Sequence, residues 1–86
     1  MNINWFQLHD VVWEGLDLRF THFYYGIVEK NHPSGLKRYD LNICSPEYEE
    51  TCIPLTHFTT LEAAQSAAEG IGELLGLASP RQSRPR

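Results

Sequence analysis

Basic residues are scarce in most of this 86-residue chain. Three of the seven Lys and Arg residues, Arg81, Arg84 and Arg86, lie in the last segment. Only four remain in residues 1–78, which hold all eleven acidic residues, so that this body carries a formal charge of −7. Binding to a nucleic-acid backbone requires basic residues that neutralise phosphates. The charge therefore argues against nucleic-acid binding by the body and favours a positively charged partner.

Long apolar runs and an export signal are also missing. No stretch approaches the roughly 20 apolar residues that span a bilayer, and residues 1–4 lack the basic start and apolar centre of a secretion signal. We therefore expect a cytoplasmic protein with no membrane segment. The two cysteines, Cys44 and Cys52, are expected to be reduced there, although cysteines on adjacent strands could in principle meet.

Motifs for catalysis and for metal binding are absent as well. Zinc sites use ligands at short paired spacings, whereas seven residues separate Cys44 from Cys52 and the histidines are scattered. No glycine-rich loop joins a strand to a helix, because Gly70 and Gly72 fall inside a helical pattern. We therefore predict that the protein is not an enzyme and that it holds no cofactor and no metal.

The clearest feature that is present is one helical segment, residues 59–77. Thr59 and Glu62 have the spacing of a capping box, and Pro80 ends the helix because proline disfavours helical geometry in the residue before it. Apolar residues recur every three or four positions, as in a helix with one buried face. This stripe contains Leu61, Ala64, Ala68, Ile71 and Leu75, and is widened by Ala67, Leu74 and Ala78.

Three glycines in this segment have two interpretations. Interior glycines cost a helix roughly 0.5 to 1 kcal/mol each relative to alanine. Gly70, Gly72 and Gly76 therefore indicate either a fraying C-terminal half capped by Gly76, or a place where a strand, a second helix or a partner chain approaches the helix backbone closely.

Strands are predicted on both sides of a clear hairpin. Residues 37–44 alternate strictly between apolar and polar, residues 23–29 are β-branched and aromatic, and residues 31–35 supply turn chemistry. Further strands are expected at residues 5–8, 16–20 and 51–55, with the first turn at His9-Asp10 or Glu14-Gly15 and the last strand at a sheet edge because of Pro54.

These elements predict an α+β fold, with an antiparallel sheet of three to four strands packed against one C-terminal helix. A chain of this length forms one domain, which we place at residues 1–78. Residues 79–86 lack an apolar anchor and are expected to form a flexible basic tail.

The predicted partner-binding surface combines acids with aromatic residues. Aromatic side chains exceed what one helix can cover, and Tyr and Trp are enriched at interface hot spots. Opposite its apolar stripe the helix presents acids with no basic residue among them, and residues 47–50 form an acidic loop. The predicted site consists of Glu47, Tyr48, Glu49, Glu50, Glu62, Glu69 and Glu73.

The order of motifs resembles small phage and prophage proteins that have a sheet of three or four strands and one helix. The resemblance rests on a Trp-rich start, on the strand residues Tyr25-Gly26-Ile27-Val28, on the hairpin, and on the helix entry from Phe58 to Ala64. Acidic proteins of this kind, including anti-CRISPR proteins, occupy the basic surfaces of nucleic-acid-handling machinery. The resemblance implies an inhibitor of that type, and transfers no active residue.

We therefore expect a non-catalytic protein-binding module, a phage-encoded inhibitor that covers a basic host surface. One alternative is a small nucleic-acid-binding module that uses Lys30, Lys37, Arg38 and the arginine tail. Another is a homodimer formed through the small-residue helix or through the Pro54 edge.

Overall fold

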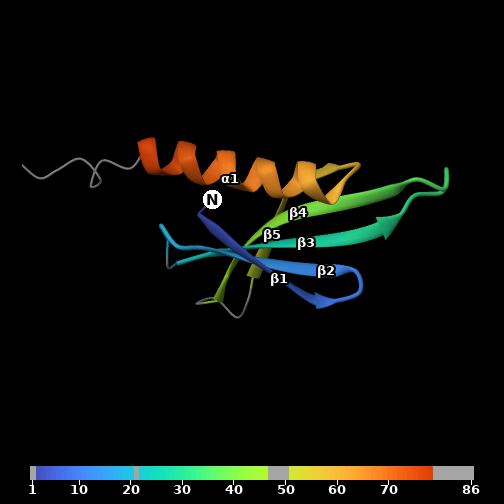
Figure 1. Ribbon diagram of the computed structural model, residues 1–86, viewed down its shortest axis with the longest axis horizontal. Coiled ribbons are helices and arrows are strands. Elements are labelled where there is room, and N and C mark those ends of the chain that lie inside the picture. Colours follow the sequence, from blue (N-terminus) through green and yellow to red (C-terminus); the bar gives the residue numbers. More distant parts are fainter. Residues whose placement is uncertain (1, 21, 47–50, 79–86) are drawn as a thin grey trace, which may run out of the picture.

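The computed structural model shows a five-stranded antiparallel sheet with one helix across one of its faces (Figure 1). It describes residues 2–20, 22–46 and 51–78. The strands follow the order β1-β2-β3-β4-β5, so each strand pairs with its neighbours in sequence. The elements are β1 (Ile3–His9), β2 (Val12–Asp17), β3 (Tyr24–Asn31), β4 (Lys37–Ser45), β5 (Thr51–Phe58) and α1 (Leu61–Ala78).

The α+β class and the C-terminal helix are confirmed, but the predicted strand number was one too low. The N-terminal residues form two full strands, β1 and β2, joined by a turn at Asp10 and Val11. The strand expected at residues 16–20 is wrong, because β2 ends at Asp17. Residues 16–20 alternate between apolar and charged side chains, which predicted a strand with its apolar face buried. In the structure Asp17 is the buried residue, while Leu16 and Leu18 are exposed.

The pairing register separates the two faces of the sheet. One row on the helix side runs from Trp5 through Gly15, Tyr25 and Ile43 to Ile53. Gly15 is required in this row, since a Cβ there would overlap the Trp5 ring. The core between sheet and helix contains Ile3, Tyr25, Ile27, Leu41, Ala64 and Ala68.

The cap and the end of helix α1 each lie one residue later in the chain than predicted. Thr60, and not Thr59, caps the helix, because its Oγ1 accepts the Ala63 N–H at 3.1 Å. Gly76 lies inside the helix and therefore does not cap it. Most of the predicted apolar stripe faces the sheet, but Leu74 is 67% exposed.

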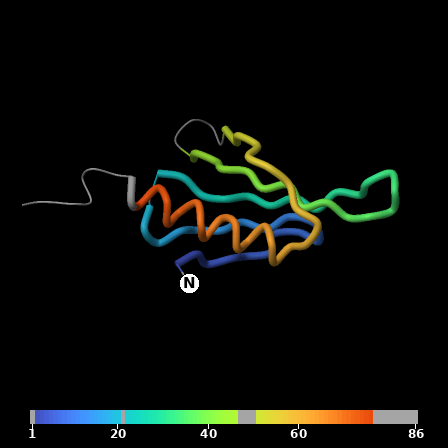
Figure 2. Tube along the Cα trace, turned by 90° about the horizontal axis from the view of Figure 1, so that it is seen from above, coloured from blue at the N-terminus to red at the C-terminus, as the bar shows by residue number. Residues whose placement is uncertain are grey.

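The β3–β4 hairpin is confirmed, and it projects beyond the rest of the sheet (Figures 1 and 2). Its strands pair as far as Asn31 and Lys37, whereas β2 pairs with β3 only as far as Val28. The turn uses Gly35 at φ 92°, a conformation that favours glycine.

A disulfide joins Cys44 to Cys52. The two residues lie directly opposite each other in the β4–β5 ladder, with their Cα atoms 4.0 Å apart. The expectation of reduced thiols is therefore wrong for this structure. Disulfides persist mainly in oxidising compartments, so the cytoplasmic location stays a prediction.

Candidate protein-interaction surface

Helix α1 crosses the sheet obliquely and leaves one corner uncovered. It starts beside the end of β5, packs against β3, β4 and β5, and reaches the start of β1 with Glu69 (Figure 2). The uncovered corner lies where β3 begins, β4 ends and β5 begins. Ile53, which belongs to the helix-side row of the sheet, is 58% exposed there.

Two adjoining pockets share Phe23. The smaller one lies at this corner, whereas the larger one extends to the other face of the sheet, because its residues Leu16 and Tyr24 alternate with the buried, helix-facing Asp17 and Tyr25. One pocket has a volume of about 330 Å³ and the other of about 250 Å³. We call their combined lining the Phe23 surface. It contains Leu16, Asp17, Leu18, Phe20, Phe23, Tyr24 and Pro46 in the larger pocket, and Phe23, Ile43, Cys44, Ser45, Thr51 and Ile53 in the smaller one.

The Phe23 ring is held in place from two sides. It stacks on Phe20 with the ring centroids 5.1 Å apart and meets the edge of Tyr25 at 5.6 Å. Tyr25 belongs to the core and is fully buried. Around this fixed ring, Leu18 and Ile53 are 70% and 58% exposed. The surface therefore combines a preformed aromatic centre with accessible aliphatic side chains.

The predicted acidic loop lies outside the part of the chain that the structure describes. It consists of Glu47, Tyr48, Glu49 and Glu50. In the sequence these residues follow Pro46, which lines the larger pocket, and precede Thr51, which lines the smaller one.

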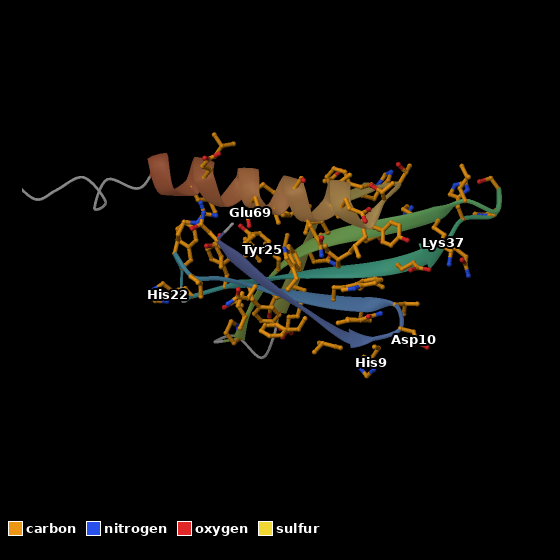
Figure 3. The ribbon with its side chains drawn as sticks, viewed as in Figure 1. His9, Asp10, His22, Tyr25, Lys37 and Glu69 are labelled. Carbon is orange, nitrogen blue, oxygen red and sulfur yellow. A yellow bond between two sulfur atoms is a disulfide. The ribbon has the colours of Figure 1, made fainter. Side chains whose placement is uncertain are left out.

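The three helix acids of the predicted site do not share one environment. Glu62 and Glu73 are exposed, as expected. Glu69 instead turns towards the sheet, where its Oε2 accepts the backbone N–H of Ile3 at 3.0 Å and that of Asn2 at 3.1 Å (Figure 3). The side chain is only 19% exposed. The exposed acidic row on α1 is therefore reduced to Glu62 and Glu73.

A buried ion pair lies beside this contact. The Arg19 side chain donates from Nε and Nη2 to the two carboxylate oxygens of Asp17, at 2.9 and 2.7 Å, and the Arg19 backbone N–H donates at 3.0 Å. Burial raises the pKa of Asp17, but these hydrogen bonds and the arginine charge outweigh burial and hold the pKa below its usual value. Asp17 is therefore a structural carboxylate that stays ionised.

Tyr25 has a perturbed hydroxyl without the features of a catalytic group. Burial, and then the charge of Asp17, raise the pKa of Tyr25 to about 12. Its hydroxyl and the Trp5 Nε1 are buried and have no hydrogen-bond partner among residues 2–20, 22–46 and 51–78. A phenol that stays protonated and is sealed under α1 cannot reach a substrate, so it contributes to packing.

The basic residues of the projecting hairpin are paired with acids. Lys37 Nζ lies 2.6 Å from a carboxylate oxygen of Glu29, while Arg38 and Lys30 both contact Asp40, at 2.8 and 3.2 Å. Burial raises the pKa of Asp40, but hydrogen bonds from Arg38 and Lys30 outweigh it, so that the pKa is lowered. The hairpin therefore offers less uncompensated positive charge than its sequence suggests.

Comparisons with protein-family models, with curated proteins and with solved structures found no match to this chain. In the described ranges, no group of three or more His, Cys, Asp or Glu side chains is placed to hold a metal ion. The same ranges contain no helix with the length and apolarity needed to cross a bilayer.

The sequence analysis did not predict the apolar pockets. It placed Phe23 in one predicted strand and Leu18 in another, at residues 16–20. An available signal was the closeness of Leu18, Phe20 and Phe23 in the sequence, since these apolar residues exceed those that a single strand face can bury.

Proposed function

We propose that this chain is a non-catalytic protein-binding module whose partner seats on the Phe23 surface. The observation that carries this proposal is the concentration of exposed apolar side chains in two adjoining pockets around an aromatic ring that packs on Phe20 and Tyr25. Contiguous exposed apolar surface bordered by polar residues is typical of interaction sites. Anchors that fill a preformed pocket supply much of the affinity at such sites.

The acidic composition makes a basic partner the best match for this surface. Residues 1–78 carry a formal charge of −7, and three of the acids lie in the sequence between Pro46 and Thr51, which line the two pockets. Acidic groups around an apolar centre would accelerate and orient association with a basic protein, while burial of the apolar centre would slow dissociation. An inhibitor that covers a basic surface of nucleic-acid-handling machinery would have these properties.

A pull-down from host-cell lysate with matched variants tests the proposal. We expect the double variant Leu18→Ser/Ile53→Ser to lose a partner that the wild-type chain retains, because it removes exposed apolar area from both pockets with little cost to folding. The control Leu36→Ser/Leu74→Ser removes two leucines that are 66% and 67% exposed elsewhere, and should retain the partner. Equal recovery with all three proteins would contradict the assignment of the Phe23 surface.

A nucleic-acid-binding function through the hairpin has one geometric observation in its favour. Lys30, Lys37 and Arg38 lie on the end of the β3–β4 hairpin that extends beyond the rest of the sheet (Figure 3 labels Lys37). Filter binding to single- and double-stranded DNA and RNA at low salt decides this alternative, since phosphate contacts are strongest there. Retention of any of them would favour the hairpin, and no retention would remove this function.

A further inference from the structure

Strand β1 forms one edge of the sheet, and the direction of its backbone groups follows from the register. The Leu18 N–H donates to the Asn2 carbonyl at 2.9 Å, and this pair continues the β1–β2 ladder. In an antiparallel ladder, hydrogen-bonded pairs alternate with pairs whose groups point outward. Asn4 and Phe6 therefore bond to β2, whereas Ile3, Trp5 and Gln7 direct their N–H and C=O groups to the open edge.

The first of these outward N–H groups, that of Ile3, already has a hydrogen-bond acceptor. Glu69 of α1 accepts the Ile3 N–H at 3.0 Å, which agrees with the outward direction deduced from the ladder. No strand within residues 2–20, 22–46 and 51–78 pairs with this edge at Trp5 or Gln7. Two residues in the middle of β1 thus retain unpaired donors and acceptors.

β1 has few of the features that usually protect an edge strand. Residues Ile3 to His9 include no Lys, Arg, Asp, Glu or Pro, and the register shifts only between Gln7 and His9, at the C-terminal end of the strand. The opposite edge, β5, is uncharged too, but it contains Pro54 and a register irregularity in the middle of its ladder. On the face of the sheet away from α1, Phe6 and Leu8 of β1 are 47% and 50% exposed.

We propose that β1 pairs antiparallel with β1 of a second copy of this chain, about a two-fold axis at Phe6. Trp5 of each copy then exchanges both backbone hydrogen bonds with Gln7 of the other, and the two Phe6 side chains meet at a closely spaced, non-hydrogen-bonded position. The sheet becomes continuous through both copies.

Two bodies with a formal charge of −7 each repel, so the net charge opposes a dimer. The edge at which we place the dimer carries no charge of its own, because Ile3 to His9 include no acidic or basic residue. This interface lies apart from the Phe23 surface, so a monomeric result would leave the proposed function intact. A strand donated by another protein is the competing occupant.

Sedimentation of the purified full chain over a range of concentrations tests the proposal. The wild type should form a dimer, and Phe6→Lys should weaken dimerisation at least about tenfold, because two lysines would face each other across the axis. The control Leu74→Lys adds the same charge on the exposed side of α1 and should dimerise as the wild type does. Circular dichroism confirms that each variant is folded.

Residue-resolved amide exchange identifies the edge directly. In the dimer, the amides of Trp5 and Gln7 should exchange at least about tenfold more slowly at high protein concentration than at low concentration. The Phe6 amide, which bonds to β2, should show no such dependence. A monomer at all concentrations, or a dimer lost in Leu74→Lys but retained in Phe6→Lys, would overturn the proposal.

Discussion

The carboxylate of Asp17 occupies a helix-facing position in β2 that an apolar side chain would normally fill. Its side chain has no exposed surface, while that of its partner Arg19 is 26% exposed. Burial of an unpaired carboxylate would cost several kcal/mol. Here the guanidinium group and the backbone N–H of Arg19 donate hydrogen bonds to both carboxylate oxygens. The charge is therefore tolerated because the residue two positions later in the chain supplies all of these donors.

Replacement of this carboxylate should be costly and should change the response to acid. We expect Asp17→Asn to lower the free energy of unfolding by about 2 to 4 kcal/mol at pH 7, because it leaves Arg19 without its partner. The folded-state pKa of Asp17 lies below the unfolded value. Its contribution is therefore complete above the unfolded pKa and is lost as the pH falls through the folded pKa, below about pH 4.

Urea unfolding between pH 2 and pH 7 measures both effects. The wild type should lose stability on acidification, whereas Asp17→Asn should lose less over the same interval. Asp40→Asn is the matched control, since its ion pairs on the hairpin are more exposed and should contribute less than about 1 kcal/mol. Equal effects of the two substitutions would show that the burial of Asp17 is unimportant.

At the level of the element, α1 contains three glycines that differ in what surrounds them. A Cβ on Gly72 would overlap Arg19 Nη2 and Asp17 Oδ2, whereas no atom of the described residues outside the helix's own backbone lies within 4 Å of a Cβ on Gly70 or Gly76. The close-approach interpretation is thus confirmed for Gly72 alone. Glycine at this position lets the buried ion pair lie against the helix backbone.

Alanine substitutions should therefore have opposite effects at two neighbouring glycines. Gly70→Ala should stabilise the protein by about 0.5 to 1 kcal/mol through helix propensity. Gly72→Ala gains the same propensity but must displace the ion pair, and should destabilise by about 1 to 3 kcal/mol net. Thermal and denaturant unfolding measure the difference, and stabilisation by both substitutions would contradict the assigned contact.

Helix and hairpin could be predicted because their signals are local. Residues Lys37 to Cys44 alternate strictly, and the stripe of α1 repeats over several turns. Which residues of β2 face the core could not be predicted. Asp17 is buried because its ion pair with Arg19 packs against Gly72 of α1, which is far away in sequence. The Phe23 surface was missed for a similar reason, since its two pockets combine side chains from strands β2 to β5 that only the folded sheet brings together.

For the molecule as a whole, stability depends on how the last strand is held. β5 pairs only with β4, contains Pro54, and has a register irregularity in its ladder. The disulfide between Cys44 and Cys52 closes a loop with a sequence separation of 8 between these two strands. It restricts the unfolded chain and keeps β5 in register beside the Phe23 surface.

Reduction should destabilise the entire domain. A loop of this length corresponds to about 2 to 3 kcal/mol in the chain-entropy model. We expect dithiothreitol to lower the midpoint of urea unfolding accordingly, and the double variant Cys44→Ala/Cys52→Ala to show a similarly low midpoint in the absence of reductant. The variant should not respond to dithiothreitol. A wild-type midpoint unchanged by complete reduction would contradict this role.

The contact between Glu69 and the Ile3 amide spans 66 residues of sequence, and this separation has a consequence during protein synthesis. The ribosome releases β1 long before it adds Glu69, whose carboxylate accepts the Ile3 N–H at the edge of β1. Until α1 emerges, the helix-facing side of the nascent sheet stays uncovered, and Asp17 and Arg19 lie in water. The domain therefore closes only after α1 has been synthesised, and chains that stall before Glu69 should be rapidly degraded or aggregate.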